Sequence, residues 1–279
     1  MSSTSVISSR RWGFSKQNDL MSYWRNTEQT RTIIIVLAVL VVVWELSVRV
    51  FGIRSFLLPA PTVVISDIID NPAFFAKQSL YTLYVTSVGF LIALVGGVLL
   101  AIAIVSSSFI DRTFYTLLVA TNSIPKVALA PLFVIWLGTG GAPKIAIAAI
   151  IAIFPIVINT TVGLRAIDND MIDLARSARA PRRDVMLKVR FPNALPSLFA
   201  GAKIGISFAL IGAIVGEFVA GEQGLGYVIL TSQATFNSTR AFAAILVLGV
   251  LGTIMFFMIE AVERWMLPWH VSQRSQKGR

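Results

Sequence analysis

Lys126 lies inside a long apolar region, residues 113–137, and its placement suggests chemistry. If this region spans a membrane, a lysine near its centre costs about 2.5–3.5 kcal/mol to insert, so its ammonium group should face the protein interior or a water-filled path. One interpretation is a cationic lining for an anionic solute, with Asn122 and Ser123 nearby. The alternative, which we weigh equally, is a structural lysine that binds carbonyl oxygens freed by neighbouring prolines.

Two carboxylates also fall within apolar runs, Glu217 and Glu45. Glu217 stands near the end of the run 197–220, where it could contact solute or a gate, but we favour a structural role in which it pairs with a basic group. Glu45 precedes Arg49 by one helical turn, which predicts an ion pair. The sequence has no cysteine and one histidine, His270, so we predict no catalytic residue and no metal site.

The composition is that of an integral membrane protein. Hydrophobic residues make up 56% of the 279 residues and charged residues 14%, whereas soluble domains carry about 25% charged residues. The formal net charge of +10 would suggest nucleic acid in a soluble protein. Here the basic residues gather in particular loops, which membrane orientation explains, so we expect no nucleic-acid partner.

Six apolar segments predict the elements that position these side chains, because a helix crosses a bilayer with about 20 residues. The predicted fold is therefore all-α, an integral membrane protein with six transmembrane helices. We place the helices at residues 33–51, 81–105, 113–137, 145–164, 197–220 and 241–258.

Basic residues set the predicted orientation of these spans. The N-terminal tail (residues 1–32), the loop between the fourth and fifth spans, and the C-terminal tail (residues 265–279) hold most of them. With six spans these segments share one side, and the positive-inside rule makes that side cytoplasmic. The transmembrane domain would then occupy residues 33–264, with both termini in the cytoplasm.

The loop between the fourth and fifth spans, residues 166–192, we call the basic loop. Asp170 and Asp173 fit an acidic capping box at a helix start. An apolar stripe at helical spacing predicts a first short helix, with the members Met171, Leu174, Ala175 and Ala178. Pro181 suits the first turn of a second short helix, which Pro192 would end. This basic, amphipathic pair of helices predicts a docking surface.

Glycines predict close contacts on the fifth span and a turn beyond it. Two pairs, each with a spacing of four, allow close helix packing. These glycines are Gly201, Gly205, Gly212 and Gly216. The polar segment 222–238 that follows predicts a re-entrant turn near an outer gate. Its candidate residues are Gly224, Gly226 and Tyr227.

The run DLARSARAPRRDVMLKVRFPNALP (residues 173–196) resembles the EAA loop of binding-protein-dependent ABC importer permeases. Asp173, Leu174 and Ala175 take the Glu-Ala-Ala places of that motif. Arg179 takes the place of its glycine, which lies at the bend between two short coupling helices. Since glycine adopts a positive φ with little strain, either Arg179 strains this bend or the bend differs in this chain.

The resemblance continues along most of the chain, through FAGAKIGIS and GLGY. The segments FLLPAPTVV and SIPKVALAPLFVIWLGTG are similar to the nitrate, sulfonate and taurine branch of the family. That branch implies a small organic or inorganic anion as solute, such as a sulfonate or nitrate. A vitamin precursor is the alternative within the family.

The resemblance implies a non-catalytic permease subunit of an ATP-driven importer in a bacterial cytoplasmic (inner) membrane. The chain lacks a G-x-x-x-x-G-K-[ST] phosphate loop, so ATP and Mg would bind to a separate ATPase and this chain would hold no cofactor. The implied partners are two ATPase subunits, a second permease copy in a homodimer, an extracytoplasmic solute-binding protein and membrane lipid. The residues implied in ATPase docking are Asp173, Leu174, Ala175, Arg176, Ala178, Arg179, Arg182 and Arg183.

Two other classes of protein serve as alternatives. A self-sufficient secondary transporter or channel would need intramembrane carboxylates for ion coupling, and Glu45 and Glu217 are the only candidates. An intramembrane enzyme would need paired aspartates within spans, a histidine cluster or a serine with a base, and we find none of these. The candidates for a translocation pathway are thus Asn122, Ser123, Lys126 and Glu217.

Overall fold

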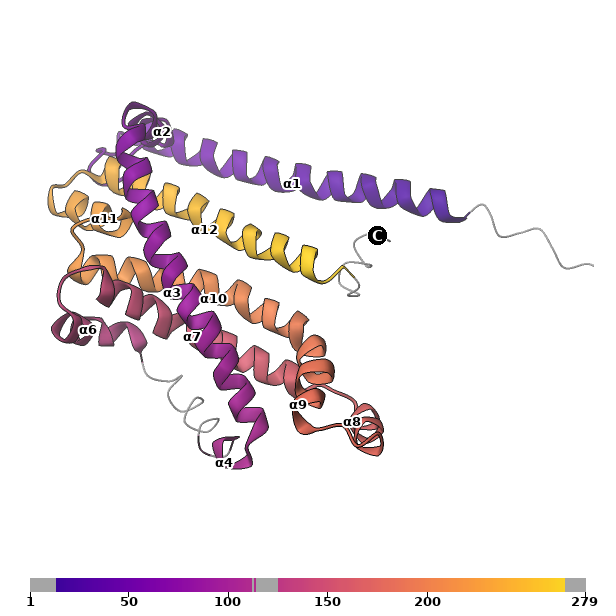
Figure 1. Cartoon of the computed structure of the whole chain (residues 1–279). Helices are drawn as coiled ribbons and strands as arrows, with labels where there is room; N and C mark the ends of the chain where they lie inside the picture. The colour runs from indigo at the N-terminus through magenta and orange to yellow at the C-terminus, as the bar shows by residue number, and fades with distance from the viewer. Residues whose placement is uncertain (1–13, 112, 114–124, 269–279) are drawn as a thin grey trace, which may run out of the picture. The chain divides into compact units, whose positions relative to one another are not determined.

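The computed structural model describes residues 14–111, 113 and 125–268, and these residues form helices and connecting turns without a strand (Figure 1). Asn122 and Ser123 lie outside the described residues. One compact unit is built on α1 (Phe14–Val50), and the other runs from Ile53 to Leu267.

In α1, the Nε of Arg49 donates a hydrogen bond to Oε1 of Glu45 at 2.6 Å. The two side chains are four residues apart on one helix face, as the sequence predicts. The predicted ion pair is therefore confirmed, and Glu45 is engaged within its own helix.

Four helical runs of the second unit are long and apolar enough to cross a membrane, and they correspond to four of the six predicted spans. They are α3 (Pro72–Ser106), α7 (Gly141–Arg165), the run Arg182–Ala220 that ends in α10 (Phe191–Ala220), and α12 (Ser238–Met266). The described part of the third predicted span is a shorter apolar helix, η2 (Lys126–Leu129) with α6 (Ala130–Leu137). The first predicted span lies within α1, and the count of six stays a prediction.

Glycines bring α10 into backbone contact with α7. A β-carbon at Gly212 would lie 2.6 Å from Cα of Ala148, and one at Gly201 would lie 2.9 Å from the carbonyl oxygen of Pro155. Contacts this short leave room for hydrogen alone, so the predicted close packing of these glycines is confirmed. A β-carbon at Gly89 of α3 would lie 2.6 Å from Cβ of the same residue, Ala148. The unit is thus centred on α3, α7 and α10.

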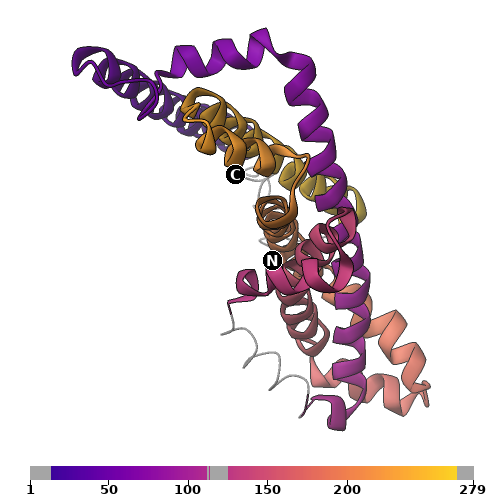
Figure 2. The ribbon, with the colours of Figure 1, turned by 90° about the vertical axis from the view of Figure 1, so that its left-hand side faces the viewer.

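These three helices give the unit two distinct ends, which Figures 1 and 2 show from two sides. At one end lie the short helices α8 (Asn169–Ser177) and α9 (Arg182–Asp184) of the basic loop. At the opposite end lie α2 (Pro61–Asp70), α11 (Leu225–Ala234) and the glycine turn, which we define as residues 221–226.

A hydrophobic cluster holds the glycine-turn end together. It joins side chains of α2, α3, α10, α11 and α12 that are all at most 9% exposed. Leu225 of α11 is fully buried in it, and Val64 of α2 is 1% exposed. The members are Val64, Phe75, Leu210, Leu225, Val228, Ile229, Ala243, Ala244 and Leu248. Since burial of each such side chain contributes about 1.5–3 kcal/mol, α2 and α11 are firmly packed parts of the fold.

Candidate docking loop and capped helix

The first helix of the basic loop begins earlier than the sequence predicts. The side chain of Asp168 accepts a hydrogen bond from the backbone N–H of Asp170 at 3.1 Å, and its carbonyl oxygen accepts from Met171. Asp168 is therefore the N-cap of α8, and the predicted capping box with Asp170 as the cap is wrong. The carboxylate at Asp168 is the one that reaches the unpaired N–H groups of the first turn.

Arg179 forms the bend that ends α8. Its φ is +54°, and the N–H of Ala180 donates to the carbonyl oxygen of Ala175 at 3.0 Å, five residues back. This is the hydrogen bond of a Schellman motif, in which the residue with positive φ is usually glycine. The bend of the motif is thus kept, and Arg179 adopts the strained conformation, at a cost of roughly 1–2 kcal/mol.

Pro192 does not end the second helix, contrary to the prediction. The helical run continues from α9 through η3 (Val185–Arg190), a π-helical segment, into α10. At the junction, the N–H of Phe191 donates to the carbonyl oxygen of Met186, five residues back. This wider turn relieves the clash that a proline ring makes with the carbonyl four residues before it.

The apolar stripe of α8 is open to solvent. The side chain of Leu174 is 73% exposed and that of Met171 is 55% exposed. Of the other residues implied in docking, Ala175 is half-buried, and the side chain of Arg176 is not among those described. The exposed ones are Asp173, Ala178, Arg179, Arg182 and Arg183. A water-exposed apolar stripe with a basic surround is typical of an interaction surface.

At the opposite end, Glu217 caps α11. Its side chain is fully buried, and its carboxylate accepts hydrogen bonds from the hydroxyl of Thr82 at 2.8 Å and from the N–H of Gly226 at 2.7 Å. A carboxylate at a helix N-terminus satisfies unpaired N–H groups and complements the positive end of the helix dipole. In this structure, Glu217 holds a helix end and does not face solvent.

Two side chains of α3 complete this cap. The N–H of Gly224 donates to Oε1 of Gln78 at 2.7 Å, and the N–H of Leu225 donates to Oγ1 of Thr82 at 2.9 Å. Side chains of α3 and α10 thus bind three consecutive N–H groups, those of the N-cap Gly224 and of the first two residues of α11. The sequence analysis missed Gln78 and Thr82, although their spacing of four on an apolar helix is a signal for one polar face.

The glycine turn encloses the Glu217 carboxylate. Gly224 has a φ of +108°, and a β-carbon there would overlap the carboxylate. A β-carbon at Gly226 would lie 2.9 Å from Oε2 of Glu217. Both glycines are buried and belong to the cap of α11, while Tyr227 is half-buried, and the outer-gate role of the three residues stays a prediction.

Lys144 lies beside this cap, directly before the start that we predict for the fourth span at residue 145. The residue is 2% exposed, and its Nζ donates to the hydroxyl of Tyr81 at 3.0 Å, 5.0 Å from the ring centroid. Its Cα also lies 2.8 Å from the position of a β-carbon at Gly216. The tyrosine therefore gives the buried ammonium group both a hydrogen-bond acceptor and an aromatic face.

Lys126 contacts an aromatic ring at mid-depth. Its Nζ lies 4.1 Å from the centroid of the Phe154 ring, near the middle of α7. Lys144, which lies beside the Glu217 cap, precedes Phe154 by ten residues on α7, about 15 Å along the helix axis. The structure thus does not bring the two charged pathway candidates together.

An ion pair between α10 and α12 was also missed. Nζ of Lys203 lies 2.7 Å from Oε2 of Glu263, and their side chains are 24% and 13% exposed. Lys203 stands within the FAGAKIGIS run, whose glycines predict a close helix contact, and we predicted no partner for the lysine. A lysine inside an apolar helix is itself a signal for a partner on a neighbouring helix.

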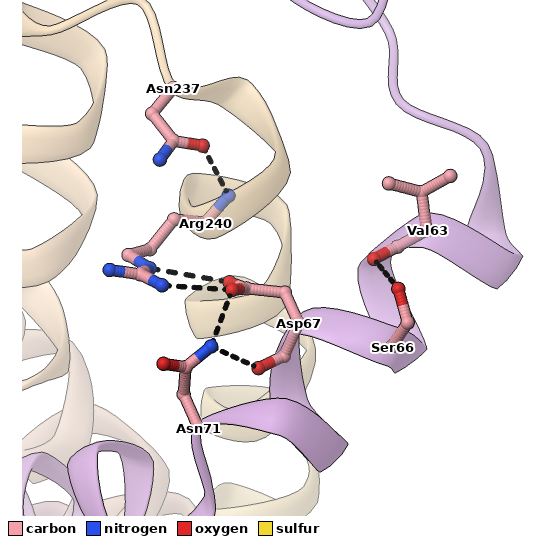
Figure 3. A network of polar contacts seen from close by, with 6 residues as sticks. All are labelled: Val63, Ser66, Asp67, Asn71, Asn237 and Arg240. Atoms are coloured by element: carbon pink, nitrogen blue, oxygen red, sulfur yellow. Dashed lines mark hydrogen bonds and ion pairs between the residues drawn. The ribbon is translucent and has the colours of Figure 1, made fainter.

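Arg240 and Asp67 tie α12 to α2 (Figure 3). The guanidinium donates to both carboxylate oxygens, at 2.9 Å from Nη2 to Oδ1 and 3.3 Å from Nε to Oδ2. The side-chain amide of Asn71 donates to the same carboxylate at 3.0 Å, and the side chain of Asn237 accepts from the N–H of Arg240 at 3.1 Å. A two-point pair of this kind fixes orientation as well as distance.

Comparison with known proteins gives a consistent family. The profile of the family described as "Binding-protein-dependent transport system inner membrane component" matches residues 93–268. The formylaminopyrimidine transport permease protein ThiX of Halalkalibacterium halodurans is 34% identical over 84% of this chain and 94% of its own length. The riboflavin transport system permease protein RibX of Chloroflexus aurantiacus is 32% identical over 85% of this chain and 90% of its own length.

Relatives named as sulfonate, nitrate and taurine permeases match at 25–28% identity, which confirms the branch that the motifs indicate. Among solved structures, an inward-facing MetNI methionine ABC transporter matches with a TM-score of 0.55 and 24% identity. The match covers 67% of this chain and 92% of the transporter chain, and it supports the fold of an ABC importer permease.

Proposed function

Because the chain belongs to the family of binding-protein-dependent transport system inner membrane components, we propose that it is an ABC importer permease whose basic loop docks on an ATPase subunit. The observation that carries this proposal is the exposed stripe of α8. Leu174 and Met171 face solvent on a helix that Asp168 caps and Arg179 ends in a fixed bend. An apolar anchor on a preorganised helix fits a groove on a partner protein.

The proposal includes an orientation and an assembly. The basic-loop end lies in the cytoplasm, where ATP is available to the partner, and the glycine-turn end lies outside. One chain offers one basic loop, and two ATPase subunits need two such loops, so a homodimer with the solute path between its copies is the simplest assembly. Sidedness can be measured by labelling single cysteines, because the chain has none of its own.

For the solute, we propose a small heterocyclic compound ahead of a simple anion. Relatives named for formylaminopyrimidine and riboflavin are 34% and 32% identical, against 26% and 28% for those named for sulfonates and nitrate. Lys126 supports the anion as the second candidate, because a cation at mid-depth attracts negative charge. Stimulation of ATPase activity in proteoliposomes by formylaminopyrimidine, riboflavin, an alkanesulfonate and nitrate separates these classes.

Replacement of Lys126 by methionine tests its role in that assay. If the ammonium group lines the path, Lys126→Met spares assembly but lowers solute-stimulated ATPase activity. Unchanged stimulation would assign Lys126 to structure, in its contact with Phe154.

The docking proposal is tested by Leu174→Ser. We expect this variant to lose the ATPase subunit during purification, because a polar side chain replaces the apolar anchor. Leu230→Ser is the matched control, since Leu230 is also exposed (43%) but lies on α11 at the opposite end. An ATPase subunit retained by the Leu174 variant would show that Leu174 is not the anchor of the docking surface. ATP-independent transport by the purified chain in liposomes would favour a self-sufficient transporter.

A further inference from the structure

A second left-handed bend lies at the end of α11, and its residue is Phe236. Its φ is +54°, its N–H donates to the carbonyl oxygen of Gln233 at 3.1 Å, and the N–H of Asn237 donates to that of Ser232 at 2.8 Å. These are the two hydrogen bonds of a Schellman motif, in which glycine is favoured at the position of Phe236. The phenylalanine is nonetheless 77% exposed, so burial of its ring does not offset the strain.

The segments on both sides of this bend are fixed. The hydroxyl of Ser238 donates to the carbonyl oxygen of Phe56 at 2.5 Å, and Arg240 binds Asp67 through two hydrogen bonds (Figure 3). At its other end, α11 is capped by buried Glu217. The ring of Phe236 is therefore presented to solvent from a rigid frame. Strained residues that a rigid surround holds in place are concentrated at functional sites.

Two further exposed apolar residues lie on the segment that Ser238 contacts next to this bend. We define the aromatic patch as Phe56, Leu57 and Phe236, which are 44%, 64% and 77% exposed. The hydrogen bond between Ser238 and Phe56 joins the two segments that carry it. Thr235 and Asn237 flank Phe236 and are exposed, and the Arg240–Asp67 pair nearby is partly exposed. An exposed amide, an exposed hydroxyl group and a partly exposed charged pair fit an aqueous boundary and not hydrocarbon.

We propose that the aromatic patch is a contact surface for the solute-binding protein, with Phe236 as its anchor. This inference rests on the proposed function, because the family supplies the partner and the proposed orientation puts the patch outside the membrane. A rigid exposed aromatic side chain gives a large contact area at low entropic cost, which is typical of residues that dominate binding energy. A lipid anchor fits less well, since membrane interfaces favour tryptophan and tyrosine, whose polar tips face water.

The first experiment measures the affinity of the permease for its solute-binding protein, with the permease complex in nanodiscs. Phe236→Gly removes the ring and relieves the strain, so we expect an unchanged or higher melting temperature. Affinity should fall at least about tenfold if the ring is an anchor. Phe109→Ala is the matched control, because Phe109 is equally exposed (78%) but lies before the predicted third span, near the basic-loop end.

The outcomes separate this inference from the proposed function. If the wild-type complex binds the solute-binding protein and Phe236→Gly binds it equally well, the aromatic patch is not the contact surface. If the wild-type complex does not bind it at all, the partner assignment is wrong, and the inference fails with it.

The second experiment uses the absence of cysteine from the sequence. A spin label at Phe236→Cys should be accessible to a water-soluble relaxation agent and become protected when the loaded solute-binding protein is added. A label that is accessible to oxygen from the lipid phase, with no change on addition of the protein, would overturn the inference in favour of a membrane contact.

Discussion

The two ends of the α7–α10 pair are held by different kinds of interaction. At the glycine-turn end, the ties are buried hydrogen bonds, from Glu217 to Thr82 and to the N–H of Gly226. At the basic-loop end, Lys188 pairs with Asp184 four residues away on the same helical run, and their side chains are 73% and 39% exposed. Buried hydrogen bonds cost about 1–3 kcal/mol per unpaired group when broken, whereas exposed ion pairs contribute about 0–1 kcal/mol. Polar contacts therefore hold α11 more firmly than they hold the second helix of the basic loop.

The two left-handed bends, at Arg179 and Phe236, also differ in how firmly the surrounding residues are held. Arg179 and Phe236 have the same φ, and at each bend the N–H of the following residue donates to the carbonyl oxygen five residues back. At Arg179 the bend stands in an exposed loop, while at Phe236 it is tied to α2 and α12. The same local motif therefore serves a loosely held surface at one end and a rigid one at the other.

The largest expected effect is at Glu217. Glu217→Ala leaves the hydroxyl of Thr82 and the N–H of Gly226 without an acceptor, so the free energy of unfolding should fall by about 3 kcal/mol or more. Hydrogen exchange of the α11 amides should increase. Glu222→Ala, on an exposed glutamate of the same turn, should change neither quantity. Equal behaviour of the two variants would show that the cap does not stabilise this end.

Gly212→Ala tests the close packing of α10 against α7, between the glycine-turn end and the basic-loop end. The added methyl group meets Cα of Ala148, so overpacking should cost about 1–3 kcal/mol, measured by denaturation in mixed micelles. Gly249→Ala is the control, because nothing lies within 4 Å of its β-carbon position. That control should be neutral or stabilising by up to about 1 kcal/mol, since alanine favours a helix.

Arg240→Ala should cost about 1–2 kcal/mol, because it leaves the partly buried carboxylate of Asp67 without its two-point partner. Arg264→Ala removes an i,i+4 pair with Glu260 whose arginine is 53% exposed, and it should cost less than about 0.5 kcal/mol. If Arg264→Ala lowers the free energy of unfolding more than Arg240→Ala does, the ion pair between α2 and α12 is not the stronger of the two.

The smallest effect is expected at Arg179 and has the opposite sign. Arg179→Gly should stabilise the bend by about 1 kcal/mol, because glycine adopts a positive φ without steric strain. Slower hydrogen exchange at Ala178 and Ala180 would report it. Faster exchange would mean that the arginine side chain contributes more to the bend than its backbone strain costs.

Local patterns in the sequence predict much of this fold. Apolar runs predict the four long spans, glycines spaced by four predict the contact of α10 with α7, and spacing predicts the pair of Glu45 with Arg49. Each depends on neighbours along one helix. The errors in the basic loop are also local: Asp168 and Asp170 are chemically equivalent caps two residues apart, and a π turn at Pro192 is not visible in a pattern of residue types.

The candidate site was less predictable, because its contacts join distant segments. Glu217 and Thr82 are 135 residues apart in the chain, and no periodicity connects them. Lys144 follows a glycine-rich turn and so resembles a loop residue, yet the close approach of α10 at Gly216 buries it. Such residues are assigned only when the packing of helices is known.

The π-helical segment at residues 185–190 has a mechanical consequence. Helical structure continues from Arg182 to Ala220, 39 residues in all, through the π-helical segment and across Pro192 and Pro196. A π turn and prolines bend a helix, and Figure 1 shows α9 set at an angle to α10. Since no non-helical residue interrupts the run, a displacement of α9 is passed directly to the basic-loop end of α10.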